Sequence, residues 1–129
     1  MNFGQMIGRL GRGLGSLILL LGLCGTARAD EKNDFFEARI RPLLAKHCLE
    51  CHGDEGPEAG LRLTSRAQLL TPAESGEPAF HSPEPAASRL LAVIRYDGEV
   101  QMPPAGKLSA QEIADLEKWV LEEIGRAHV

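Results

Sequence analysis

Two segments of the chain carry hydrophobic residues at helical spacing. In the first, which precedes residue 48, the apolar side chains recur at i, i+4, i+7 and i+8: Phe36, Ile40, Leu43 and Leu44. This pattern predicts an amphipathic helix, which Asn33 or Asp34 is expected to cap. Pro42 has no N–H to continue the helical ladder, so we expect a kink there or a helix broken in two.

The second amphipathic segment lies near the end of the chain. Ser109 and Glu112 have the S-x-x-E spacing of a capping box, which marks a helix start. The residues after it are apolar at i, i+3 and i+7, with a tryptophan alongside: Ile113, Leu116, Val120 and Trp119. We expect this helix to pack across the first one.

The sequence between these segments predicts little regular structure. A short helix is expected over residues 65–70, and a buried one over residues 88–94 after Pro85. The stretch over residues 71–87 holds four prolines and is expected to be irregular. These elements indicate a small all-α domain, and aromatic residues make up only 5% of the chain to build its core.

The first 29 residues have the features of a cleaved secretion signal. Arginines precede an apolar run, Leu14–Cys24, which is too short for a membrane span. Ala27-Arg28-Ala29 has the small-x-small pattern of a leader-peptidase site, so we expect cleavage after Ala29. Lipidation of Cys24 is the weaker alternative because bulky Leu23 precedes it. The prediction is a leader over 1–29, a domain over 30–122, and no membrane span after cleavage.

Charge and compartment narrow the function. The leader holds three basic residues and no acidic ones, so its loss changes the net charge from −4 to −7. An acidic domain of this kind is not expected to bind nucleic acid or an anionic membrane. The leader predicts a periplasmic or other extracytoplasmic location.

The chemistry is concentrated in residues 48–52, CLECH. Once the leader is gone, Cys48 and Cys51 are the only cysteines. A redox pair is one interpretation, but no βαβ pattern surrounds it, and a zinc site would need two more ligands. C-x-x-C-H is also the attachment sequence of haem c, in which two thiols bond the porphyrin and His52 ligates the iron. On a helical turn all three side chains project to one side. We therefore predict one covalent haem c per chain, which also supplies the missing centre of the core.

The second axial ligand of the iron must come from elsewhere in the chain. The candidates are Met102, His47 and His81. His47 is tied beside Cys48 on the proximal side, and His81 lies in a proline-rich loop. Met102 is the only methionine outside the leader, and Pro103 and Pro104 stiffen the loop that carries it. Met102 is therefore the predicted distal ligand, with a core-filling methionine as the alternative.

Four segments resemble a known family: IRPLLAKHCLECHG, GLRLTSRAQLL, SRLLAVIRYDGEVQMPP and KLSAQEIADLEKWV. Between residues 36 and 119 the chain is similar to the planctomycete-type cytochrome c domain, within the class I cytochrome c group. The resemblance implies a one-haem electron carrier that is often the N-terminal module of a larger secreted protein. Its partners would be a redox protein or fused C-terminal domains. The chain departs from the family around Phe80 and His81, where it has ESGEPAFHSPE.

The last seven residues, 123–129, differ from the rest. EIGRAHV resembles the translation of a sequencing adapter, and the helical pattern stops at Gly125. We interpret it as a non-native tail on a truncated record, with a natural C-terminus after a glycine cap as the alternative. His128 is assigned no role.

The sequence thus predicts an electron-transfer haem domain that is not itself an enzyme. Alternatives are the electron-entry domain of a secreted oxidoreductase, a haem enzyme or sensor with an open sixth position, and a non-haem disulfide or metal knuckle. No spacing typical of a hydrolase is present.

Overall fold

A computed structural model describes residues 26–124 of the chain. Cys24 and His128 lie outside these residues, as do most of the predicted leader and the end of the predicted tail. The cleavage after Ala29 and the division of the chain at residue 122 remain predictions.

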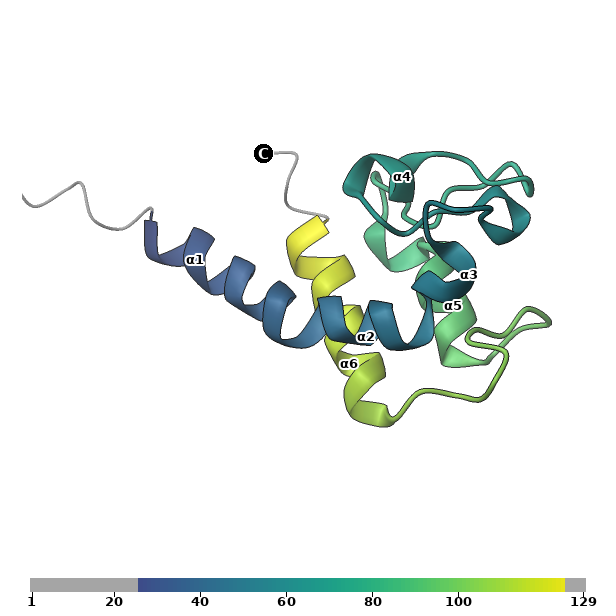
Figure 1. Cartoon of the computed structure of the whole chain (residues 1–129). Helices are drawn as coiled ribbons and strands as arrows, with labels where there is room; N and C mark the ends of the chain where they lie inside the picture. Colours follow the sequence, from purple (N-terminus) through teal and green to yellow (C-terminus); the bar gives the residue numbers. More distant parts are fainter. Residues whose placement is uncertain (1–25, 125–129) are drawn as a thin grey trace, which may run out of the picture.

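All regular elements within residues 26–124 are helices (Figure 1), which confirms the all-α fold class. The α-helices are α1 (Thr26–Phe35), α2 (Arg41–His47), α3 (Leu49–His52), α4 (Arg66–Leu70), α5 (Arg89–Arg95) and α6 (Ala110–Lys118). Short π or 3-10 segments are η1 (Phe36–Ile40), η2 (Glu58–Gly60), η3 (Pro85–Ala87) and η4 (Trp119–Ile124).

The N-terminal helix begins earlier than predicted. α1, η1 and α2 follow one another without a loop, and Asn33 and Asp34 lie exposed inside α1, so the prediction that they cap the helix is wrong. Of the two outcomes predicted at Pro42, a kink or a broken helix, the helix is not broken but changes direction directly before the proline. η1 is a π-turn in which the Arg41 N–H donates to the Phe36 carbonyl, and Pro42 follows in the first turn of α2. The helix changes direction across this π-turn (Figure 1), directly before Pro42, which has no N–H to donate to the Ala38 carbonyl.

α6 begins at the predicted capping box and packs on the N-terminal helix. Ser109 Oγ accepts from the Glu112 N–H, and the Glu112 carboxylate accepts from the Ser109 N–H at 2.9 Å. The rings of Phe36 and Trp119 lie 5.7 Å apart between centroids, and Arg39 forms a 2.8 Å ion pair with nearly buried Asp115. Aromatic contact and ion pair together join the two ends of the domain, as predicted.

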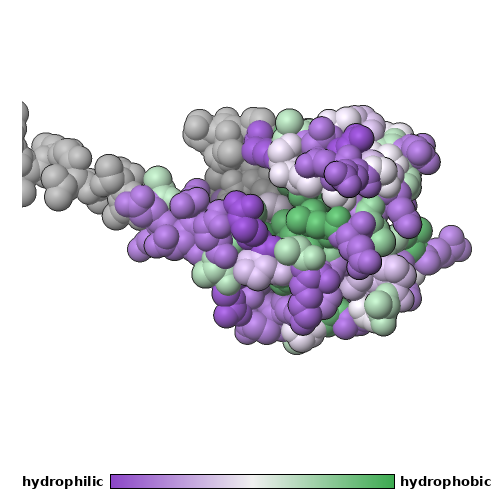
Figure 2. Space-filling model, in the orientation of Figure 1, coloured by the Kyte–Doolittle hydropathy of each residue, from purple (hydrophilic) through white to green (hydrophobic). Residues whose placement is uncertain are grey.

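The predicted short helices in the middle of the chain are present as α4 and α5. Ser65 caps α4 by accepting from the Gln68 N–H. Residues 71–87 are irregular apart from η3, yet this segment supplies Phe80, the largest fully buried side chain, whose N–H donates to the Leu69 carbonyl. On the face drawn in Figure 2, hydrophilic residues surround a central area of hydrophobic ones.

Candidate cofactor site

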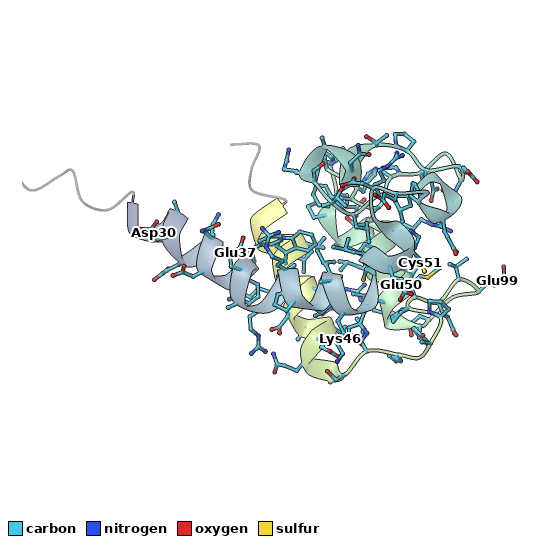
Figure 3. All side chains as sticks on the ribbon, viewed as in Figure 1. Asp30, Glu37, Lys46, Glu50, Cys51 and Glu99 are labelled. Atoms are coloured by element: carbon cyan, nitrogen blue, oxygen red, sulfur yellow. The ribbon has the colours of Figure 1, made fainter. Side chains whose placement is uncertain are left out.

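Residues 48–52 form a tight helical turn after α2. The Cys48 N–H still donates to Leu44, and the Cys48 carbonyl accepts from the His52 N–H at 2.9 Å. Cys51 is exposed on α3, next to Glu50. Figure 3 shows both at the same end of the domain as Glu99, on the loop after α5, and far from Asp30 on α1. Cys48, Cys51 and His52 all line one cavity, so the turn presents the three side chains to the same space.

Gly53 is required by the way this turn ends. A Cβ at residue 53 would lie 2.6 Å from the Leu49 carbonyl oxygen, closer than a carbon atom can approach it. A residue with a side chain would therefore displace either α3 or the chain that leaves it. The glycine lets the chain leave α3 directly after His52 and return past the imidazole.

His52 is oriented by the loop that returns past it. Its Nδ1 lies 3.2 Å from the Leu61 carbonyl oxygen, and its own carbonyl accepts from the Leu63 N–H at 2.9 Å. Because a carbonyl oxygen only accepts, Nδ1 carries the proton and donates it. Nε2 then keeps its lone pair, which is the form of imidazole that ligates a metal.

The two cysteines differ in their surroundings. Cys48 is half-buried, and burial raises the pKa of its thiol to about 11, whereas Cys51 is exposed. A thiolate is the form that binds metals and exchanges disulfides, and at neutral pH Cys48 is protonated. A neutral, buried sulfur is the form that a thioether also presents, so the environment of Cys48 suits haem attachment better than zinc binding.

Met102 lies on another wall of the same cavity. It is half-buried in the loop between α5 and α6, and its N–H donates to the Val93 carbonyl at 3.1 Å. Pro103 behind it is buried, and the bond between the two is a cis peptide. The structure thus brings together the four residues predicted to hold haem: Cys48, Cys51, His52 and Met102.

The cavity has a volume of about 190 Å³ and is mainly apolar. Its aliphatic side chains and prolines are Ala59, Leu61, Leu63, Ala73, Ala79, Leu90, Val93, Ile94, Val100, Pro103, Pro104 and Leu108. Arg89 is one of the polar lining residues that sequence reasoning missed, together with Glu58, Ser75 and Glu77. Its guanidinium pairs with Glu77 at 3.3 Å, and helical periodicity alone could not place it at the cavity.

The other two candidate axial ligands occupy different places. His47 lines the cavity, but its Nε2 lies 3.2 Å from Glu112 Oε1 at the start of α6. His81 is exposed and is not among the residues that line the cavity, and its N–H donates to buried Ser88 Oγ at 3.0 Å. Of the three candidates, Met102 alone combines a place at the cavity with a side chain outside any ion pair.

The contact between His47 and Glu112 leads to a pH prediction. The pKa of Glu112 is lowered, first by the N–H and hydroxyl of Ser109 and then by His47, so folding favours the carboxylate. Its contribution is fully present above its unfolded pKa, near 4.5, and is lost as pH falls through the lower folded value. In urea unfolding of the haem-loaded protein, Glu112→Gln should lower the free energy of unfolding most at pH 7. The difference between wild type and variant should become smaller below about pH 4.5. A difference between wild type and variant that is constant from pH 7 to 3 would contradict the lowered pKa of Glu112.

The residues present fit a haem. An apolar cavity suits the porphyrin, a histidine Nε2 and a methionine sulfur are established iron ligands, and two cysteines stand where thioethers would form. No three His, Cys, Asp or Glu side chains among residues 29–122 are grouped to hold a metal ion on their own. Likewise, none of the helices described is long and apolar enough to cross a membrane.

A helical domain with C-x-x-C-H at an apolar cavity is typical of c-type cytochromes. Residues 48–106 match the family model described as Planctomycete cytochrome C, which confirms the resemblance predicted from the sequence. The match covers the attachment motif, α4, α5 and Met102. No curated protein matches the chain significantly, and neither does any solved structure.

Proposed function

We propose that this chain is a one-haem electron-transfer domain that works outside the cytoplasm as the N-terminal module of a larger protein. The bound haem would supply one-electron chemistry at its iron. The chain itself would be an electron carrier rather than an enzyme, delivering electrons to a redox partner protein or to fused C-terminal domains.

Each of the four cavity residues has a distinct part in this proposal. Cys48 and Cys51 would form the thioether bonds, and His52 would ligate the iron through Nε2, while its Nδ1–H donates to the Leu61 carbonyl. Met102 would supply the second iron ligand through its sulfur. The observation that carries the proposal is that residues from two distant segments, 48–52 and 102, line one apolar cavity.

Two observations favour electron transfer over an enzyme or sensor with an open sixth position. A methionine lies at the cavity where an open site would need space, and the surface of the cavity is mainly apolar. The extracytoplasmic location rests on the features of the leader and on the oxidising compartment in which haem c is usually attached. The larger-protein context rests on the family resemblance, and the electron-entry domain of a secreted oxidoreductase is compatible with the same haem chemistry.

Haem staining of a denaturing gel tests the cofactor, because only covalently attached haem survives denaturation. Expressed with its leader in a host that matures haem c, the protein should stain, and its haem-to-protein ratio should be one. Cys48→Ser combined with Cys51→Ser should abolish the stain, whereas His81→Ala, an exposed change away from the cavity, should keep it. Well-expressed, folded protein that never stains would refute the haem assignment.

A further inference from the structure

The loop that carries Met102 is tied down at three points. The Met102 N–H donates to the Val93 carbonyl in α5, and the Gln101 side chain donates to the Tyr96 carbonyl at 3.3 Å. The third tie is a hydrogen bond from the Tyr96 hydroxyl to the carbonyl of Pro103. Two of these bonds therefore fix the backbone at Met102: one is made by its own N–H, and the other by the carbonyl of the following residue, Pro103.

Tyr96 reaches Pro103 because of an unusual backbone conformation. It follows the last residue of α5 with φ +64° and ψ +28°, in the left-handed region that glycine and asparagine usually fill. A bulky residue in this conformation is held by its surroundings, and such residues concentrate at functional sites. Here the conformation ends α5, and the half-buried tyrosine side chain bridges the loop that begins there.

We propose that Tyr96 is a positioning residue that holds the Met102 sulfur on the haem iron. The inference rests on the proposed function, in which Met102 is the distal ligand. Pro103 is buried and has no N–H, so its carbonyl is the backbone polar group immediately beyond Met102 that can be anchored. With the N–H of Met102 and the carbonyl of Pro103 both fixed, the thioether has few conformations to lose when it binds iron.

The alternative is that Tyr96 supports the fold without affecting the iron ligand. In that case Tyr96→Phe would lower overall stability and leave the iron coordination unchanged. The two roles separate in the equilibrium between Met102 bound to iron and Met102 displaced, which an added ligand such as imidazole reports. Losing one hydrogen bond that favours the bound state should shift that equilibrium about tenfold.

The experiment compares imidazole binding to the ferric haem-loaded protein for wild type, Tyr96→Phe and Thr71→Val. Thr71→Val is the matched control, because it also removes a hydroxyl that donates to a backbone carbonyl at a helix end, Ala67 at 2.9 Å, away from the cavity. Tyr96→Phe should bind imidazole about tenfold more tightly and weaken the near-infrared sulfur-to-iron band. Thr71→Val should match wild type in both.

Any other result contradicts either the role of Tyr96 or the assignment of Met102 as iron ligand. Equal imidazole affinity in Tyr96→Phe and wild type, with the sulfur-to-iron band intact in both, overturns the role of Tyr96 and leaves the proposed function standing. If wild type lacks the band and binds imidazole as Met102→Ala does, the ligand assignment fails, and the role of Tyr96 with it. If Tyr96→Phe attaches haem but does not fold, its role is structural and the positioning role is overturned.

Discussion

Replacing Met102 with alanine is expected to abolish the near-infrared sulfur-to-iron band of the ferric haem-loaded protein. Alanine cannot ligate iron, and neither of the other two candidate ligands is placed to replace the thioether: His47 faces Glu112, and His81 lies outside the cavity. The ferric haem should then bind imidazole or cyanide readily and lose low-spin character. The reduction potential should fall, since histidine–methionine ligation raises it. Optical spectra of both redox states and a potentiometric titration measure these effects.

The matched control for this prediction is His81→Ala. His81 was a candidate ligand from the sequence, and the structure places it on the surface beside Ser88. Its removal should leave spectrum, potential and ligand binding as in wild type. Loss of low-spin character in His81→Ala but not in Met102→Ala would reverse the assignment and make His81 the distal ligand.

The features that the sequence predicts well are those fixed by neighbouring residues. The C-x-x-C-H turn needs only five residues, and the S-x-x-E box at Ser109 needs four, so each can be recognised without knowing the rest of the fold. The sequence also predicts two amphipathic helices, and α6 packs on the N-terminal one as expected. The choice of Met102 depended on residue type and on the stiffness of the QMPP loop.

The features that the sequence missed depend on distant contacts or on a locally unusual backbone. The Leu61 carbonyl that orients His52 carries no sequence signal, because every residue has a carbonyl. Tyr96 at positive φ could not be foreseen, since glycine or asparagine is expected there. The cap predicted at Asn33 or Asp34 was wrong because α1 already begins at Thr26. Residues that can cap a helix are common, so their presence alone does not mark where a helix begins.

Phe80 shows the same limit and gives the second prediction. It lies in a proline-rich segment with little other apolar content, yet its side chain is 0% exposed and belongs to the same core cluster as Leu91, Leu116 and Val120. Phe80→Ala should lower the free energy of unfolding by about 3–5 kcal/mol, the sum of lost transfer energy and a new cavity. For a small domain that is a large part of the total stability. Urea unfolding of the haem-loaded protein, followed by circular dichroism, measures the change.

Phe35→Ala is the control for this prediction, because it removes the same atoms from a partly exposed site. The Phe35 ring lies at the edge of the core, with the Lys118 ammonium 4.4 Å from its centroid. We expect this variant to lose clearly less stability than Phe80→Ala, since its surroundings remain in contact with water and leave no closed cavity. The denaturant slope should stay the same in both, so that midpoints can be compared directly. If Phe80→Ala costs no more than Phe35→Ala, residues 71–87 do not close over the core, and the wall of the cavity at neighbouring Ala79 would have to be placed differently.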